Sequence, residues 1–219
     1  LINDWCLKNS FNMGVNWADG QETAIRLINA LLTFKIVDQE DIPKYTYNRE
    51  LFIKSHLLRL KQTYFYEQSQ NNNHWISFAA GMFIGGGWLL KKSIKSKKIG
   101  KEYINFGRYE LEKSLKKLVL EDGTFSQYST NYHRFVLDTL CQVEIWRRDL
   151  KLPLLSKDFY IQCKKLTKWY LYFIDSNSGR ISNIGNNDGC LCYQLISKDY
   201  RDCRATAYLS SYIFNKRIL

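Results

Sequence analysis

Apolar side chains recur along much of the chain at the spacing of one helix face. The first such stripe is formed by Ala24, Leu27, Ile28, Leu31 and Leu32, which follow the i, i+3, i+4, i+7, i+8 pattern. Three more stripes have the same period: Ile104, Leu111, Leu115 and Leu118; Val136, Leu140 and Val143; and Phe159, Cys163, Leu166, Tyr170 and Phe173. This spacing predicts an amphipathic helix at each of the four positions.

Further helices are predicted between these stripes. One lies between Tyr45 and Tyr66, a more apolar one runs from His74 to Leu90, and a short one occupies Arg204 to Phe214. Gly85–Gly87 lies inside the apolar helix, where small residues permit close helix packing. Polar turns separate the helices at Asn71–Asn73, Asp122–Gly123, Ser176–Gly179 and Ile181–Asp188. We expect about six or seven helices of roughly 12 to 22 residues, without a clear strand.

Composition narrows the fold class. The 219 residues are 45% hydrophobic and 24% charged, which is typical of a globular chain with a sizeable core. The chain has only two prolines, which favours helices over a turn-rich β-sandwich. We predict one all-α domain over residues 1–219. Antiparallel helix pairs stack into a bundle, a solenoid or a closed toroid, and the lack of a repeat of about 34 or 40 residues argues against a regular solenoid.

The charge favours an anionic partner. The net charge of +11 leaves acidic polysaccharide, nucleic acid and an anionic membrane surface as candidates. The lysine run from Lys91 to Lys101 predicts a solvated loop, and nucleic acid is not expected because no recognition motif accompanies the run. The apolar segment Phe78–Leu90 is well short of the roughly 20 residues that span a membrane, so no transmembrane segment is predicted. The six cysteines lack CxxC spacing and are predicted to be buried free thiols, which leaves the redox compartment open.

Three polar clusters lie at predicted helix ends, where sites are usually built. They are Asn71–Trp75, Asp122–His133 and Asn183–Gly189. Each has a purely structural interpretation as well: a helix cap with an exposed His, a turn before an ordinary helix, and a solvated turn. Each of the first two clusters holds one His and His56 stands alone, which argues against a multi-His metal site, and no metal is predicted.

Four blocks of sequence follow one another in an order typical of a known family. The first is Gly14–Trp17 with Gly20–Arg26, and the second is Asn72–His74 followed by Ala80–Phe83. The third joins Asp122–Phe125 to Ser129 and Tyr132–His133, and the fourth joins Gly185–Gly189 to Asp199–Arg204. Together they resemble the alginate-lyase-like helical domain of the heparinase II/III-like polysaccharide lyases. The match covers nearly the whole chain and is greatest to bacterial members whose genes accompany surface-polysaccharide genes.

The resemblance implies a fold, a partner and a location. It implies an incomplete (α/α) toroid, followed in full-length members by a C-terminal β-sandwich domain that this sequence does not reach. We therefore interpret the chain as a fragment of a longer protein and expect at most weak activity from it alone. A periplasmic or cell-envelope location is favoured, and a cytoplasmic one stays open.

The resemblance also implies an activity and residue roles. Such lyases cleave uronic acid glycosides by β-elimination without a redox cofactor, and no cofactor is expected. Asn73 and His74 match the residues that neutralise the substrate carboxylate, and His74 could share the role of base. Tyr132 matches the family tyrosine and serves as base or acid if nearby cations lower its pKa.

The remaining predicted site residues would contact or surround the acidic polysaccharide. Trp17 and Arg26 are expected to line a sugar groove, with Arg26 pairing with uronate or sulfate. His133, Asn187 and Asp188 are assigned to substrate binding beside the reacting groups.

Two rival functions stay open. An inverting glycoside hydrolase would need two carboxylates roughly 6.5–9.5 Å apart, and Asp122, Asp188 and Glu22 are its candidates. A non-catalytic module that binds polyanionic glycans would need only the charge and the aromatic residues.

Overall fold

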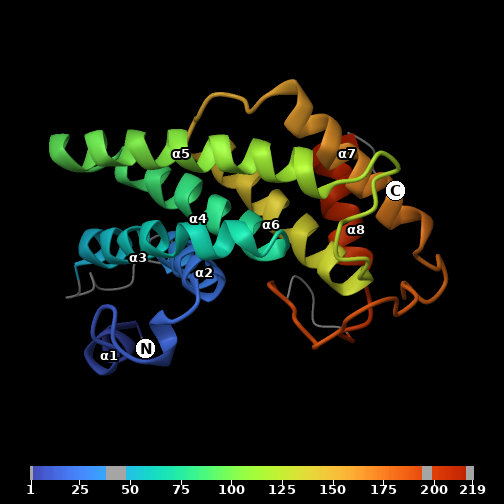
Figure 1. Cartoon of the computed structure of the whole chain (residues 1–219), viewed down its shortest axis with the longest axis horizontal. Coiled ribbons are helices and arrows are strands. Elements are labelled where there is room, and N and C mark those ends of the chain that lie inside the picture. Colours follow the sequence, from blue (N-terminus) through green and yellow to red (C-terminus); the bar gives the residue numbers. More distant parts are fainter. Residues whose placement is uncertain (1, 38–47, 194–198, 216–219) are drawn as a thin grey trace. The chain divides into compact units, whose positions relative to one another are not determined.

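Helices make up the regular structure of the part of the chain that is described. The computed structural model describes residues 2–37, 48–193 and 199–215 (Figure 1). Its helices are α1 (Ile2–Lys8), α2 (Gly20–Val37), α3 (Arg49–Ser69), α4 (Asn73–Leu89), α5 (Ile94–Leu118), α6 (Thr130–Asp149), α7 (Lys157–Tyr172) and α8 (Arg204–Ser210). A 3-10 turn, η1 (Val15–Trp17), precedes α2, and a π-helical turn, η2 (Ser211–Asn215), follows α8. The predicted all-α class is confirmed.

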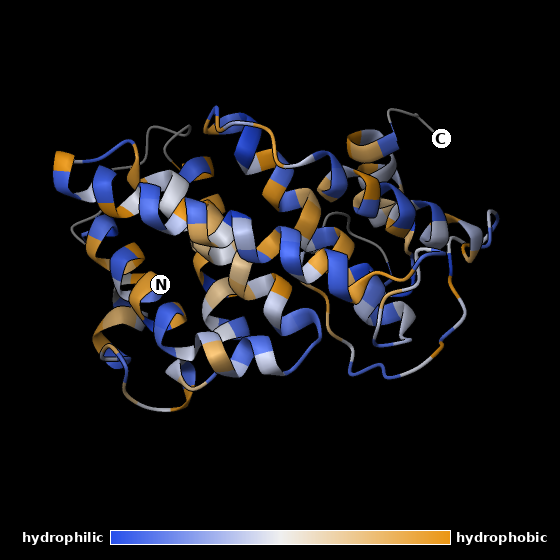
Figure 2. Cartoon of the chain, turned by 45° about the horizontal axis from the view of Figure 1, so that its top comes forward, coloured by the Kyte–Doolittle hydropathy of each residue, from blue (hydrophilic) through white to orange (hydrophobic). Residues whose placement is uncertain are grey.

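The predicted helices are present, with shifted ends. The apolar helix α4 begins at Asn73, and α3 begins at Arg49, whereas Tyr45 lies outside the described residues. Helix α5 has 25 residues, longer than expected, and the short helix α1 was not predicted. Polar and apolar residues alternate around most of the helices (Figure 2), as the periodic stripes require.

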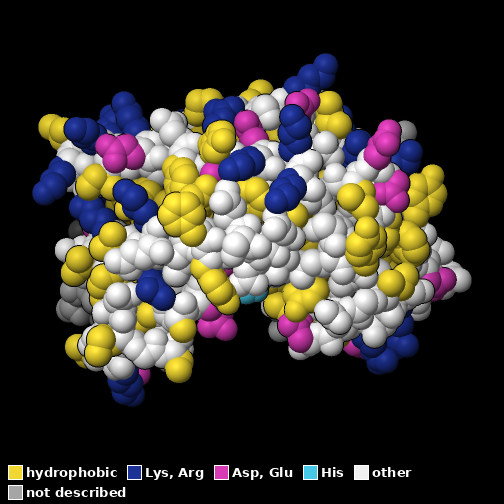
Figure 3. Space-filling model, viewed as in Figure 1, with side chains coloured by type: hydrophobic (Ala, Val, Ile, Leu, Met, Phe, Trp, Pro, Cys, Tyr) yellow, Lys and Arg dark blue, Asp and Glu magenta, His cyan; other side chains and the backbone are white. Residues whose placement is uncertain are grey.

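The lysine run is solvated, as predicted, but most of it is not a loop. Lys91 and Lys92 lie in the turn after α4, and the lysines from Lys95 onward occupy the first turns of α5. The prediction of a loop is wrong there because α5 begins at Ile94, and its first turns bury the small residues Ser96 and Gly100 rather than an apolar stripe. Figure 3 shows Lys and Arg side chains spread over the drawn face and interspersed with Asp and Glu.

The chain divides into two compact units, and each is described by itself. The N-terminal unit comprises Leu1–Gln70 and Ser77–Arg108, and the C-terminal unit comprises Asn71–Ile76 and Tyr109–Leu219. Helices α4 and α5 therefore contribute residues to both. A single domain over the whole chain stays a prediction.

In the N-terminal unit, glycine allows two helix backbones to approach closely. A Cβ atom at Gly86 of α4 would lie 2.9 Å from the Gly100 carbonyl oxygen and 2.9 Å from the Ile104 amide nitrogen, both on α5. A side chain at this position would force the helices apart. The predicted close packing of the glycine-rich helix is confirmed at this residue.

In the C-terminal unit, α6 is the central element. It buries residues on almost every face, from Thr130 to Trp146, and α7 and α8 lie beside it in Figure 1. Such all-round burial is typical of a core helix, so polar side chains on α6 need partners inside the unit.

Two further sequence predictions concern the cysteines and the membrane. All six cysteines are free; Cys141, Cys163 and Cys203 are buried, and Cys6, Cys190 and Cys192 are half-buried. None of the described helices combines the length and the apolar character that a membrane crossing requires.

Candidate functional site

The polar loop 181–189 is attached to the beginning of α6. The Ser129 hydroxyl caps the helix by accepting a hydrogen bond from the Tyr132 amide (3.1 Å), and it donates to the carbonyl of Asn186 (2.6 Å). One residue further, the Thr130 amide donates to the carbonyl of Ile184 (3.0 Å). The loop and the first turn of α6 therefore share hydrogen bonds, although they lie more than fifty residues apart in sequence.

Gly185 makes this attachment possible. Its φ of +72° lies in the left-handed region, and a Cβ atom there would collide with the backbone carbonyl oxygen of Tyr128. The left-handed backbone and this close contact thus explain why the first position of the Gly185–Gly189 block is a glycine.

The docked loop brings a carboxylate to the Tyr132 hydroxyl. This hydroxyl donates to Asp188 Oδ2 at 2.8 Å, while Asp188 Oδ1 accepts from the Cys190 amide (3.0 Å) and from Asn131 Nδ2 (3.4 Å). Partial burial, and then the Asp188 carboxylate, raise the pKa of Tyr132 to about 12. The condition that nearby cations lower this pKa is not met in these surroundings, and the hydroxyl is protonated at neutral pH.

A second polar layer lies behind this pair. The Tyr200 hydroxyl is 2.7 Å from Asn131 Oδ1 and 2.8 Å from Asn187 Oδ1, and its single proton serves one of these acceptors at a time. Arg134 Nη2 also donates to Asn131 Oδ1 (3.3 Å), and the guanidinium carbon lies 4.4 Å from the centre of the Tyr200 ring. The predicted residue Asn187 therefore shares the Tyr200 hydroxyl with Asn131, which in turn donates to Asp188.

Next to this network lies a cavity of about 300 Å³. Asn131, Arg134, Asn187 and Tyr200 all line it, so the polar network forms one of its walls.

Asn73 and His74 occupy the beginning of α4. The Asn73 amide donates to Gln127 Oε1 (3.1 Å), and the His74 amide donates to Asn72 Oδ1 (2.9 Å), which caps the helix. Asn73 is buried and His74 is half-buried. The contact with Gln127 ties the start of α4 to the segment that leads into α6 and Tyr132.

His133 lies in the core rather than at the surface. It is 1% exposed, its ring stacks on Trp169 at 4.5 Å, and its Nε2 is 2.9 Å from the carbonyl oxygen of Leu166. Burial lowers its pKa to about 4. This environment favours a packing role over the contact with substrate that the sequence suggested, because the side chain turns toward α7.

Trp17 and Arg26 belong to the N-terminal unit. Trp17 is 3% exposed, and the Arg26 guanidinium carbon lies 5.1 Å from its ring and 4.7 Å from that of Trp5. Arg26 Nε donates to His56 Nε2 (3.1 Å), while His56 Nδ1 donates to the Phe52 carbonyl (2.8 Å). Burial lowers the pKa of Arg26 to about 10 and that of His56 to about 3, so the guanidinium stays charged and the imidazole neutral.

Only part of this cluster borders open space. Arg26 and Trp5 line a hollow of about 610 Å³, together with Asp4 and Lys8. Trp17 does not line this hollow and borders one of only about 50 Å³, which leaves Arg26 as the predicted groove residue at the larger hollow.

Each carboxylate of the rival hydrolase has its own local surroundings. Asp122 is exposed and accepts hydrogen bonds from the amide and hydroxyl of Thr124, both at 2.8 Å, which lower its pKa. These hydrogen bonds are typical of a turn. Glu22 belongs to the N-terminal unit, whereas Asp188 belongs to the C-terminal unit. Within the C-terminal unit, Asp188 accepts from the Tyr132 hydroxyl and Asp122 accepts from Thr124.

Sequence reasoning missed Asn131, Arg134 and Tyr200. Asn131 and Arg134 are three residues apart on one face of α6, where polar residues interrupt an otherwise buried helix. That interruption was a usable signal, because buried polar groups need partners. Tyr200 lies inside the quoted Asp199–Arg204 block but had no assigned role.

Comparisons of this chain with family models, with curated proteins and with solved structures find no match. The resemblance therefore depends on the four sequence blocks, and the geometry of the C-terminal unit is the separate observation that bears on function.

Proposed function

We propose that this chain is the helical part of a polysaccharide lyase that cleaves a uronic-acid-containing polysaccharide by β-elimination. The observation that carries the proposal is the convergence of three sequence blocks within the C-terminal unit. The hydrogen bonds that join them run from Asn73 to Gln127, from Ser129 to Asn186 and from Tyr132 to Asp188. Blocks that only shaped turns would not need to meet.

The proposed reaction begins at the C5 proton of the uronate. This proton is weakly acidic, so donors must first neutralise the adjacent carboxylate and the enolate-like charge that develops on it. The resemblance gives this role to Asn73 and His74 at the beginning of α4. Because Asn73 is buried and His74 is half-buried, we propose that His74 meets the carboxylate directly and that Asn73 acts behind it. His74 also takes the C5 proton as general base.

Tyr132 acts as the general acid in this scheme. Its hydroxyl is protonated at neutral pH, and an alkoxide leaving group is a stronger base than a phenolate, so proton transfer to O4 is downhill. Asp188 accepts the hydroxyl proton in the resting state and so fixes the orientation of the phenol. The C5–H and C4–O bonds break, a C4=C5 double bond forms, and no water is consumed.

The finer structural expectations belong to the same proposal. We propose the incomplete (α/α) toroid and a C-terminal β-sandwich partner on the basis of the family resemblance alone. A cell-envelope location is proposed on the same basis.

A glycan-binding module without catalysis is the second candidate. The cavity beside Tyr200 favours it, because arginine and amide side chains suffice to bind an acidic sugar. The two candidates differ in whether bound polymer is ever cleaved.

The test is the absorbance near 230 nm of the unsaturated product, measured over a panel of uronate polysaccharides. The chain is assayed alone and within the longer protein expected to carry the sandwich. Tyr132→Phe should lower turnover by roughly 10²–10⁴-fold, because a general acid is lost with little packing. Tyr128→Phe is the matched control, since that side chain is 64% exposed and four residues away.

The variant results separate the candidates. Wild-type turnover in Tyr132→Phe would remove Tyr132 from the mechanism. Polymer binding without elimination, in both forms of the protein, would favour the binding module.

A further inference from the structure

The cavity of the C-terminal unit has an unusually one-sided lining. Three guanidinium groups border it, from Arg134 on α6, Arg180 on the segment after α7, and Arg201 before α8. Asn131, Asn183 and Asn187 add three amides at its wall, and no carboxylate is among the described residues that line it. The lining thus combines positive charge with neutral hydrogen-bonding groups.

Arg134 is a buried cation with neutral partners. It is 4% exposed, and its Nη atoms donate to the carbonyls of Tyr200 (2.7 Å) and Cys190 (3.4 Å) and to Asn131 Oδ1. No carboxylate oxygen of the described residues lies within 4.0 Å of it. Burying a charge is costly without a counter-charge, so an anion in the cavity would compensate Arg134.

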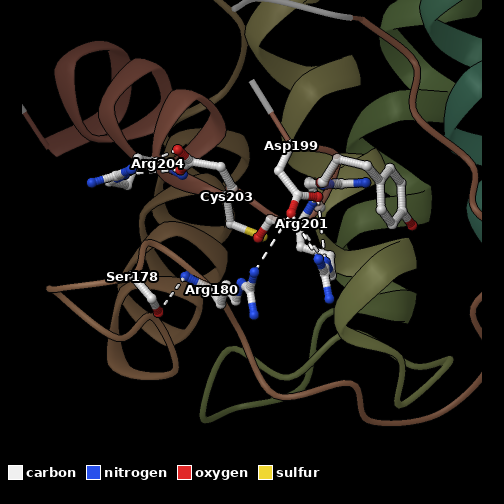
Figure 4. Close-up of polar contacts among 9 residues, drawn as sticks. Ser178, Arg180, Asp199, Arg201, Cys203 and Arg204 are labelled. Atoms are coloured by element: carbon white, nitrogen blue, oxygen red, sulfur yellow. Dashed lines mark hydrogen bonds and ion pairs between the residues drawn. The ribbon is translucent and has the colours of Figure 1, made fainter. Parts of the chain in front are cut away.

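The other two arginines share one carboxylate. Arg201 Nη2 lies 2.9 Å from Asp199 Oδ2, and Arg180 Nη2 lies 3.6 Å from the same oxygen (Figure 4). Arg204, also drawn there, pairs separately with Asp202 at 2.6 Å. Asp199 is thus shared by two of the guanidinium groups at the cavity, and the Asp138 carboxyl on α6 interacts with the third, Arg134, from beyond ion-pair distance.

The backbone holds Arg180 in this position. The Asp175 amide donates to the Arg180 carbonyl (2.9 Å), and the Cys203 amide donates to the carbonyl of Gly179 (2.8 Å). The segments that carry Arg180 and Arg201 are therefore hydrogen-bonded to one another beside the cavity, which preorganises their charges.

We propose that this cavity binds the oxyanion of one acidic sugar unit, a carboxylate or a sulfate, through Arg134, Arg180 and Arg201. Arginine recognises both groups through paired N–H donors. A volume of about 300 Å³ is at the lower end of ligand pockets, which suits a single sugar unit. The amides of Asn131 and Asn187 connect the cavity to Asp188 and Tyr132, so the bound unit lies beside the proposed general acid. This inference takes only the class of substrate from the proposed function.

The test is calorimetric titration of the 219-residue chain at low salt. The ligands are glucuronate, a sulfated glucose, methyl glucoside and inorganic sulfate. Glucuronate or the sulfated sugar should bind, the neutral glucoside should not, and inorganic sulfate should bind more weakly than the sugar anion. Comparing the affinities for glucuronate and for the sulfated glucose shows whether the cavity prefers a carboxylate or a sulfate.

Variants then assign the binding to the cavity. The double variant Arg180→Gln/Arg201→Gln should weaken binding about tenfold or more, because it removes two charge-assisted donors. Both side chains are more than half exposed, so the fold should persist, and the melting temperature checks this. Arg148→Gln is the matched control, since it removes an exposed arginine of α6 that does not line the cavity.

Arg134→Lys is the second variant, because it keeps the buried charge but loses the paired donors. Unchanged affinity in the double variant, or equal affinity for inorganic sulfate and for the sugar anions, would overturn the proposal. If binding depends on these arginines but no elimination is detected, the proposal for the cavity is supported. Only the proposed lyase activity is then contradicted.

Discussion

Arg26 in the N-terminal unit and Arg134 in the C-terminal unit are two arginines with different surroundings. Both are withdrawn from solvent and lie against aromatic rings, two tryptophans for Arg26 and Tyr200 for Arg134. Among the described residues that line its hollow, Arg26 is the one arginine, and Lys8 and Asp4 add one charge of each sign. Arg134 shares its cavity with two more guanidinium groups and no lining carboxylate among the described residues.

The difference teaches that burial and stacking alone do not make a binding site. Arg26 has a neutral imidazole acceptor and a cage of rings, so its cluster is suited to holding α2 and α3 together. The surroundings of Arg134 add the guanidinium groups of Arg180 and Arg201, a cluster of positive charge that is suited to an anionic ligand. The following predictions test this contrast.

The largest effect is expected for Trp17→Ala. Removing a buried indole should lower the free energy of unfolding by about 3–5 kcal/mol, as measured by urea denaturation. The affinity for glucuronate should not change, with Trp17→Phe as a milder variant. Loss of glucuronate affinity at unchanged stability would make the N-terminal cluster a sugar site and break the contrast.

The next effect concerns Asp138, one helical turn after Arg134. Burial raises the pKa of this carboxyl from 3.8 to about 7, although Thr206 donates to its Oδ1 at 2.8 Å. Because the pKa of Asp138 is higher in the folded state than in the unfolded state, protonation of this carboxyl stabilises the fold, and the contribution is fully present below pH 3.8. It is lost as the pH rises through about 7, a change of about 1–4 kcal/mol.

Unfolding curves between pH 4 and pH 8 of the wild type and of Asp138→Asn would check this. The asparagine keeps an acceptor for Thr206 and should flatten the pH dependence, whereas the exposed Asp158→Asn should not. An unchanged profile in Asp138→Asn would mean that Arg134 already holds the carboxyl ionised.

Arg26→Met should have a moderate effect on stability. It removes the donor to His56 and the cation over two indole rings, and it should cost about 1–3 kcal/mol in the free energy of unfolding. Lys61→Met on the exposed face of α3 is the control. A stability equal to the wild type, combined with weaker sugar binding, would contradict the structural role of Arg26.

The smallest effect is the dependence on salt. Affinity for an acidic polymer should fall as ionic strength rises, because exposed charges are screened over about 8 Å at physiological salt. The exposed Arg180 and Arg201 should contribute up to about fivefold between low and physiological salt. The double glutamine variant should show a shallower salt slope, and salt-independent binding of the wild type would point to neutral sugar and aromatic stacking instead.

Much of the fold could be predicted from periodicity, because most helices are long enough to show several turns of an apolar stripe. Helix α1 has seven residues and fewer than two complete apolar repeats, so it carries no such signal. The beginning of α5 was hidden by its lysines, which are unfavourable near the positive end of a helix dipole.

The candidate site was predictable only in part. Tyr132 and Asp188 were found through separate blocks, but their contact spans 56 residues and depends on how the loop docks. Adjacent residues on a helix point about 100° apart, so Tyr132 is half-buried beside the loop while His133 enters the core, a difference that the sequence block did not distinguish. Tyr200 meets Asn131 across 69 residues, a closeness that no local pattern encodes.

Ser129 couples the local unfolding of the first turn of α6 to the detachment of the loop 181–189. Its hydroxyl accepts from the Tyr132 amide in the first turn of α6 and donates to the carbonyl of Asn186. The adjacent Thr130 amide donates to the Ile184 carbonyl, and the Ile184 amide donates to the Thr130 hydroxyl (3.3 Å). The first turn cannot fray without breaking the bond that anchors the loop. Amide hydrogens at the two places, at Tyr132 and at Ile184, should therefore exchange with solvent deuterium through one shared opening event. The loop that carries Asp188 then behaves as part of the helix terminus rather than as an independent surface segment.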